Sequence, residues 1–186
     1  MRYADYAVGR FFDMVRDKPY FDDTLFVIVG DHGARVYGRE EIPMRSYELP
    51  LVVYAPKHVK PARVGTLMGQ IDIAPTVLGL LNMSYDSVFF GRDVLLKDGN
   101  RPYALLSHNR DVALYHDPSL VVLGIQRAVA AYRYSKIDNE QREAVRDPED
   151  VRDAAALYQT AYHLYRRGQY RLAHPVVAHK RPGTME

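Results

Sequence analysis

The chain has 186 residues, of which 47% are hydrophobic, and this length and composition suit one domain with a substantial core. Its formal net charge of +2 comes from 25 basic and 23 acidic side chains that are mixed along the chain, so we expect no nucleic acid partner. Cysteine is absent, which excludes disulfides, thiolate metal sites and a cysteine nucleophile here, and no apolar run approaches the roughly 20 residues of a membrane-spanning helix.

The first elements are a predicted helix and strand. Residues 3–15 place apolar side chains three and four positions apart with charged residues between them, which predicts an amphipathic helix. A Lys-Pro pair and an Asp-Asp-Thr turn then separate this helix from a run of apolar, mainly β-branched residues at 25–29. We predict that this run is a buried parallel strand, within half of a βαβ unit whose other half would lie upstream.

Asp31 and His32 follow this strand, at the point where the chain leaves the sheet. Functional side chains of α/β sheets converge at such strand ends. A carboxylate beside a neutral imidazole suits Zn²⁺ or Mn²⁺, and the carboxylate alone suits Mg²⁺, although a bare Asp-His pair is more often a chance dipeptide. Gly30 and Gly33 would let the backbone turn sharply and approach a bound group. Two ligands fall short of the three or so that a catalytic metal usually needs.

A polar, irregular loop is expected at 34–48, over the strand ends. Its Arg35 and Arg39 could reach an anion bound at a metal, because a guanidinium pairs with phosphate or sulfate oxygens, although solvated loop arginines are more frequent. A second short buried strand is predicted at 50–56, beside the first.

The middle of the chain changes from helix to strand patterns. Asp72 is expected to cap a structural helix that tolerates Pro75 in its first turn. Beyond it, short alternating segments separated by turn residues predict a small antiparallel sheet, with strands at 103–107, 112–115, 120–125 and 129–134.

The clearest helix signal lies near the C-terminus. Asp147 stands at the cap position, Pro148 follows at the first helical position, and an Arg-Arg-Gly sequence ends the pattern. The aromatic face of this helix, which includes Tyr158, Tyr162 and Tyr165, is expected to pack on the antiparallel sheet. Residues 171–186 show no periodicity and are expected to be a loose tail.

Five segments in this order resemble the C-terminal half of the sulfatase-like catalytic domain of the alkaline phosphatase superfamily. They are YADYAVGRFF at 3–12, DTLFVIVGDHG at 23–33, LPLVVYAP at 49–56, QIDIAPTVL at 70–78 and FGRDVL at 90–95. The tyrosine-rich helix and the Asp-His-Gly sequence are most similar to those of lipoteichoic acid synthases and of phosphoglycerol transferases that act on osmoregulated glucans. The match covers residues 3–98, whereas the later sheet and helix fit in outline.

The resemblance implies an α/β fold with three parts. Part of an alkaline-phosphatase-like sheet, flanked by helices, would occupy 1–98. A small antiparallel sheet and a C-terminal helix would pack on the same core at 99–170, and a tail would follow at 171–186. From this resemblance we expect the chain to be a piece of a longer protein.

The resemblance also implies that Asp31 and His32 are two ligands of a divalent metal, Mn²⁺, Mg²⁺ or Zn²⁺, in the intact family protein. The family's nucleophile, which is a threonine, serine or formylglycine, lies upstream together with the remaining acidic ligand and the substrate-binding residues. No catalytic nucleophile is therefore expected in this chain, and its substrate-binding residues stay unassigned. With two ligands we expect the chain to bind metal weakly, if at all.

A third ligand within the chain could come from His108, if its segment folds back toward the strand ends. A lone loop histidine is more often on the surface, and His116 and His163 are interpreted in the same way.

Three functions remain open. The first is the C-terminal part of a metal-dependent phosphoglycerol transferase or phosphohydrolase, inactive alone, with a phosphoglycerol lipid or glucan as substrate. The second is part of a sulfatase, which would use a formylglycine nucleophile. The third is a non-catalytic α/β module that self-associates through exposed strand edges. Because the family's catalytic domains work outside the cytoplasm, tethered to a membrane, the resemblance implies an extracytoplasmic location.

Overall fold

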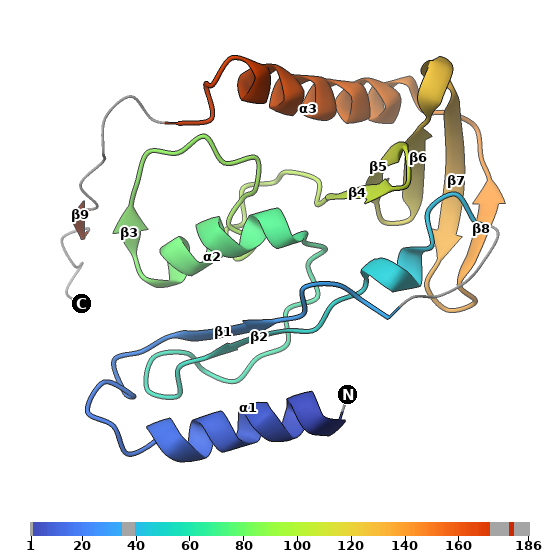
Figure 1. Cartoon of the computed structure of the whole chain (residues 1–186). Helices are drawn as coiled ribbons and strands as arrows, with labels where there is room; N and C mark the ends of the chain where they lie inside the picture. Colours follow the sequence, from blue (N-terminus) through green and yellow to red (C-terminus); the bar gives the residue numbers. More distant parts are fainter. Residues whose placement is uncertain (1, 35–39, 172–178, 181–186) are drawn as a thin grey trace. The chain divides into compact units, whose positions relative to one another are not determined.

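The computed structural model describes residues 2–34, 40–171 and 179–180. The chain forms two compact units, each with its own sheet (Figure 1). The first unit comprises Met1–Val36 and Arg45–Val64, and the second comprises Tyr37–Met44 and Gly65–Glu186. No helix in the described part of the chain is both long and apolar enough to cross a bilayer.

The first unit packs a helix against a two-stranded ribbon. Helix α1 (Arg2–Val15) confirms the predicted amphipathic helix, and strand β1 (Phe26–Val29) pairs with β2 (Leu51–Tyr54). Phe12 of α1 meets Phe26 and Tyr54 edge-on, with 5.2 Å between ring centroids in both pairs. This aromatic cluster fixes the helix to the ribbon, because edge-to-face rings add directional contacts to the burial of apolar area.

The prediction that β1 is a buried parallel strand is wrong in both direction and burial. The two strands are antiparallel, with Phe26 opposite Tyr54 and Val29 opposite Leu51. The described part of the connection between them contains one helical turn, η1 (Met44–Tyr47), and no α-helix of the kind that usually forms the crossover of a parallel pair. Val29 is 39% exposed and Val52 is 51% exposed. The placement of the second strand beside the first is confirmed.

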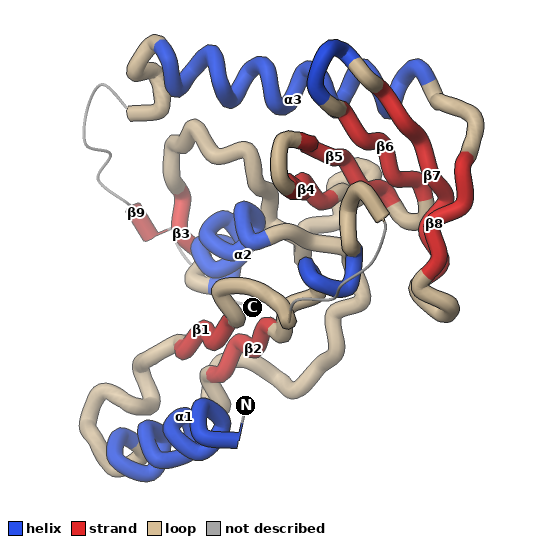
Figure 2. Tube along the Cα trace, turned by 45° about the vertical axis from the view of Figure 1, so that its right-hand side comes forward, coloured by secondary structure: helices blue, strands red, loops and turns tan. Residues whose placement is uncertain are grey.

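The second unit is built on an antiparallel meander of five strands in sequence order (Figure 2). The strands are β4 (Ala104–His108), β5 (Asp111–His116), β6 (Ser119–Leu123), β7 (Val129–Ser135) and β8 (Glu140–Glu143). The first four confirm the predicted sheet. All four side chains of β8 are polar, so no alternation marks it. In β6 the side chains of Leu120, Val121 and Val122 are at most 2% exposed, and this strand is the centre of the core.

Helix α3 (Pro148–Arg166) packs against β5 and β6 (Figure 1). The Asp147 side chain accepts a hydrogen bond from the Glu149 N–H at 2.9 Å, which confirms the predicted cap. Ala154 is fully buried in one cluster with Leu114 and Val121. These small and branched side chains allow the helix to lie close to the sheet.

The aromatic face of α3 contacts the sheet at one of the three predicted positions. The Tyr158 hydroxyl lies within hydrogen-bond distance of two sheet carbonyls, 2.6 Å from that of Leu106 and 3.2 Å from that of Ala113. Tyr162 is 64% exposed and Tyr165 is 67% exposed, so their predicted packing is wrong. The last turns of α3 continue beyond the end of the sheet (Figure 1), and the helical period alone does not reveal where a sheet stops.

Asp72 ties a loop to the start of helix α2 (Ile73–Leu80), which follows the short turn η2 (Gln70–Asp72). It stands at the predicted cap position, but its side chain does not cap α2. The carboxylate is buried and accepts hydrogen bonds from the N–H groups of Gly69 at 2.8 Å and Arg92 at 2.9 Å. Asp72 therefore links two of the motif segments, 70–78 and 90–95, because its buried carboxylate accepts a hydrogen bond from the Arg92 N–H on the far side of the loop.

The segment that follows α2 pairs with part of the C-terminal tail. Strand β3 (Met83–Ser84) is antiparallel to β9 (His179–Lys180), so the prediction of a loose tail is wrong for these two residues. The rest of the tail after Arg171 lies outside the described residues. One more helical turn, η3 (Ile125–Arg127), connects β6 to β7.

An ion pair between the turn before β6 and the residue after β7 makes the stability of the second unit depend on pH. The Lys136 ammonium donates to Asp117 and, against the opposing effect of partial burial, holds the pKa of that carboxyl below its usual 3.8. A carboxyl group whose pKa is lower in the folded than in the unfolded protein stabilises the fold at pH values above its usual pKa. This contribution is lost as the pH falls through the pKa of the folded state. We expect Lys136→Met to lower the free energy of unfolding near neutral pH and to change it less at about pH 3. Urea denaturation at both pH values, with Lys97→Met as the control, measures this difference.

Candidate metal centre

Asp31 and His32 lie just beyond the end of β1, as predicted. The ribbon continues to Gly30, whose N–H donates to the Pro50 carbonyl at 3.3 Å, and the chain then bends away. The His32 side chain is 82% exposed and that of Asp31 is 89% exposed. Both groups are therefore accessible to an ion or a substrate from solvent.

The backbone orients the His32 ring. Its Nδ1 lies 3.0 Å from the Gly33 carbonyl oxygen, and this contact assigns the proton to Nδ1. The lone pair of Nε2 then points outward, and histidines that bind metals usually have their other nitrogen held in this way. The local backbone thus selects the tautomer that a metal ligand needs.

Asp31 supplies a second donor atom beside this imidazole. Its Oδ1 accepts the His32 N–H at 2.9 Å, and its Oδ2 lies 3.7 Å from His32 Nε2. Metals such as Zn²⁺ bind nitrogen and oxygen donors at about 2.1 Å, so one ion could contact both atoms across this gap. The two side chains therefore fit one divalent ion.

Gly33 has a steric role in this loop. A Cβ at this position would overlap the carbonyl oxygen of Ser46, so only glycine permits the approach of these two backbone segments. At Gly30 a Cβ would meet its nearest neighbours at 3.6 Å, which is an ordinary contact. The close approach at Gly33 is thus to the backbone around Ser46, and the expected approach to a bound group stays a prediction.

The described residues contain no group of three or more histidine, aspartate and glutamate side chains that could hold a metal ion. His108 ends β4 in the second unit, where its backbone pairs with Asp111. His163 is exposed on α3, as predicted. Within the described ranges the candidate centre therefore consists of Asp31 and His32, and Arg35 and Arg39 lie outside those ranges.

His116 is buried, so the prediction that it lies on the surface is wrong. Its Nδ1 lies 2.8 Å from the Pro102 carbonyl oxygen, and its ring meets Tyr103 edge-on at 5.9 Å. It occupies the end of β5, where the segment before β4 contacts the imidazole. His116 therefore has a structural place in the second unit.

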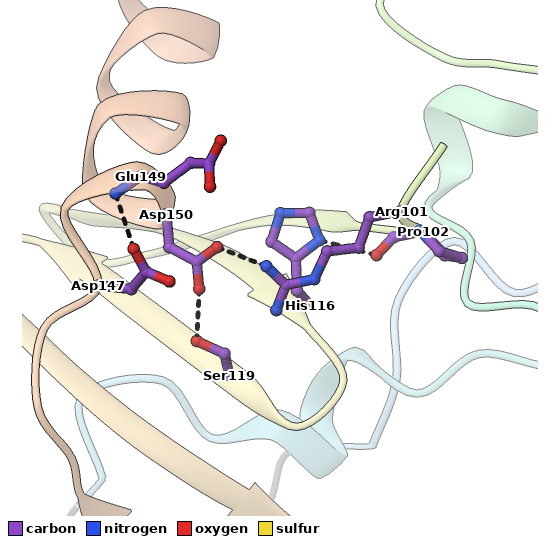
Figure 3. A network of polar contacts seen from close by, with 7 residues as sticks. All are labelled: Arg101, Pro102, His116, Ser119, Asp147, Glu149 and Asp150. Atoms are coloured by element: carbon purple, nitrogen blue, oxygen red, sulfur yellow. Dashed lines mark hydrogen bonds and ion pairs between the residues drawn. The ribbon is translucent and has the colours of Figure 1, made fainter. Parts of the chain in front are cut away.

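A second polar cluster surrounds Asp150 in the first turn of α3 (Figure 3). One carboxylate oxygen accepts from Arg101 Nη1 and the other from Ser119 Oγ, both at 2.7 Å, and the Asp150 side chain is 4% exposed. Sequence reasoning missed this role, because nothing local connects Asp150 with an arginine 49 residues away. With both oxygens hydrogen-bonded, the cluster anchors α3 to the sheet.

Parts of this chain are similar to a family model and to curated proteins. Residues 1–83 match the family model described as Sulfatase. Lipoteichoic acid synthase 2 of Bacillus subtilis is 30% identical over 52% of this chain and 17% of its own length. Phosphoglycerol transferase I of Xanthomonas campestris is 28% identical over 58% of this chain and 15% of its own length. The chain thus spans less than a fifth of these curated relatives.

A solved structure extends the match to the second unit. A protein of the alkaline phosphatase superfamily from Vibrio parahaemolyticus superposes with a TM-score of 0.83 and is 27% identical. The superposition covers 90% of this chain and 41% of that chain. Together these matches confirm the resemblance inferred from the five motifs: residues 1–83 match the Sulfatase family model, and the chain shares the fold of an alkaline phosphatase superfamily protein over nine-tenths of its length.

Proposed function

We propose that this chain is the metal-binding C-terminal part of a phosphoglycerol transferase or related phosphohydrolase of the sulfatase-like family. The observation that carries the proposal is the pair of donor atoms 3.7 Å apart, Asp31 Oδ2 and His32 Nε2, within the segment that matches the family. The names of the two curated relatives support phosphoglycerol chemistry. The substrate is then a phosphoglycerol lipid or glucan, and the site of action is extracytoplasmic.

In this proposal the chain's own residues orient and expose two ligands. The Gly33 carbonyl holds the His32 ring, and the His32 N–H holds the Asp31 carboxylate, so both donors face solvent without further rearrangement. A divalent ion, when bound, lowers the pKa of an attacking hydroxyl and neutralises charge at a phosphoryl group. The nucleophile and the remaining ligands belong to a part of the family domain outside these residues, so the chain alone is inactive.

Metal titration tests the role of Asp31 and His32. We expect Mn²⁺ to bind with a dissociation constant of roughly 0.1–1 mM, because two protein ligands leave most of the coordination shell to water. Substituting both residues with alanine should abolish this binding, as measured by water-proton relaxation. The matched control, Asp86→Ala with His163→Ala, removes the same two residue types elsewhere and should bind like the wild type. Binding that survives the Asp31 and His32 substitutions contradicts the proposal.

The description of the matching family favours a second candidate, sulfuric ester hydrolysis. Both reactions use a metal to polarise an oxyanion, so Asp31 and His32 serve either. The nucleophile separates them, since a sulfatase needs a formylglycine made from cysteine or serine. Assays of a complete family protein containing this segment, with phosphate and sulfate esters, would show which ester is cleaved.

A third candidate is a self-associating module, and an apolar groove in the first unit favours it. The groove has a volume of about 420 Å³ and lies between α1 and β1, where it is lined by Ala7, Val8, Phe11, Phe12, Phe26, Val27 and Ile28. Sedimentation velocity over a range of protein concentrations distinguishes this candidate, because only self-association gives a concentration-dependent mass.

A further inference from the structure

The C-terminal end of α3 and the residues after it present an exposed surface of aromatic and cationic side chains. We name it the Tyr-Arg surface, and it consists of Tyr162, Tyr165, Arg166, Arg167, Tyr170 and Arg171. The three tyrosines are 64%, 67% and 46% exposed, and the three arginines are also exposed. Large side chains of this kind usually bury more of their area in a folded protein, so the surface requires an explanation.

The end of the helix arranges these side chains. Gly168 adopts a φ of +68°, a conformation that glycine accepts readily, and the Gln169 N–H bonds back to the Leu164 carbonyl at 2.9 Å. This reversal places the Tyr170 ring on that of Tyr165, with stacked centroids 5.8 Å apart. The Arg171 guanidinium lies 5.3 Å from the centre of the Tyr170 ring. The rings are thus held in place while they remain open to solvent.

The charge of this region differs from that of the rest of the chain. Residues 154–185 contain no aspartate or glutamate and include five basic residues, Arg166, Arg167, Arg171, Lys180 and Arg181. The expectation of evenly mixed charge therefore fails here. Cations near a helix C-terminus stabilise the helix dipole, which accounts for Arg166 and Arg167. The helix dipole does not account for Arg171, which lies past the end of the helix, or for the exposed tyrosines.

We propose that the Tyr-Arg surface binds the surface of an anionic lipid bilayer. Tyrosine is amphipathic and concentrates at the level of lipid headgroups, where its ring contacts acyl chains and its hydroxyl contacts water. Arginine pairs with phosphate oxygens through two N–H groups, and basic side chains are attracted to anionic leaflets. A soluble polyanion would engage the arginines but would leave the rings without a role. This inference is independent of Asp31 and His32.

Vesicle flotation of the whole chain tests the proposal. We expect binding to vesicles of phosphatidylcholine mixed with phosphatidylglycerol, weaker binding at high salt, and little binding to phosphatidylcholine alone. The triple variant Arg166→Gln, Arg167→Gln, Arg171→Gln should lower the partition coefficient about 100-fold, from a contribution of roughly fivefold for each basic side chain. The variant Tyr162→Ser, Tyr165→Ser should lower it several-fold with the charge unchanged.

Matched controls make the test specific. The variant Arg63→Gln, Lys97→Gln, Arg146→Gln removes the same charge from exposed positions elsewhere, and Tyr3→Ser with Tyr6→Ser removes two exposed tyrosines of α1. Circular dichroism of each variant checks that its helices are kept. The proposal is overturned if the control arginine and lysine substitutions weaken binding equally, or if the Tyr162 and Tyr165 substitutions have no effect. Equal displacement by soluble polyphosphate would also overturn it, since the surface would then be a site for polyanions in general.

Discussion

Replacing Gly91 with alanine is expected to destabilise the second unit by roughly 3 kcal/mol. A Cβ at this position would overlap the carbonyl oxygen of Ile71 and lie 2.8 Å from the Asp72 nitrogen. Both are backbone atoms, so no side-chain rotation can relieve the overlap. The Ile71 backbone is also held in place, because the Asp72 carboxylate next to it binds the N–H groups of Gly69 and Arg92.

Urea denaturation followed by circular dichroism measures this effect, and Gly65→Ala is its matched control. Gly65 lies in the same unit, and a Cβ there would meet no atom within 4 Å. We expect the control to change the free energy of unfolding by less than about 0.5 kcal/mol. Equal stability of the two variants would mean that the loop at Gly91 moves away at little cost.

Asp150→Ala is expected to lower stability by about 3 kcal/mol, because it removes one buried acceptor from two partners. The Arg101 side chain is 53% exposed and would regain water, whereas the Ser119 hydroxyl would lose its partner beneath the helix (Figure 3). The first turn of α3 would also lose an acidic side chain that favours the helix N-terminus. The loss should appear as a lower urea midpoint.

Asp153→Ala provides the control for Asp150. Asp153 is exposed and stands three residues further along the same helix, so its substitution should change stability by less than about 0.5 kcal/mol. A double-mutant cycle with Ser119→Ala should give a coupling energy of about 1 kcal/mol. A coupling energy of zero would show that the 2.7 Å contact does not contribute to stability.

Local patterns were sufficient to predict most helices and strands. The Asp147-Pro148 start of α3 and the alternation of β4 to β7 are confirmed, because caps and half-buried strands depend on neighbours in sequence. Strand β8 was missed, since a polar edge strand carries no alternation. The predicted direction of β1 was wrong, because an apolar run of five residues indicates a strand but does not show with which strand it pairs, or in which direction.

The polar residues singled out in the sequence show the same difference between local and long-range contacts. The exit of Asp31 and His32 from β1 was predictable, because both residues follow directly on the strand. The burial of Asp72 and His116 was not, since each depends on residues from another segment, Arg92 in one case and Pro102 in the other. The sequence therefore located Asp31 and His32 relative to their strand, but it did not reveal which polar groups are buried in the fold.

Because the β1–β2 ribbon has two strands, we expect it to open locally more often than a larger sheet would. An isolated pair of strands is marginally stable in water, and here the ribbon relies on the aromatic cluster of α1 for support. Local opening of this ribbon should release its amide protons to solvent sooner than those of β6. An ion that binds Asp31 and His32 more tightly in the closed form of the ribbon than in the open form would stabilise the closed form. The first unit thus places Asp31 and His32 at the end of a ribbon whose closed state a bound ion would make longer-lived.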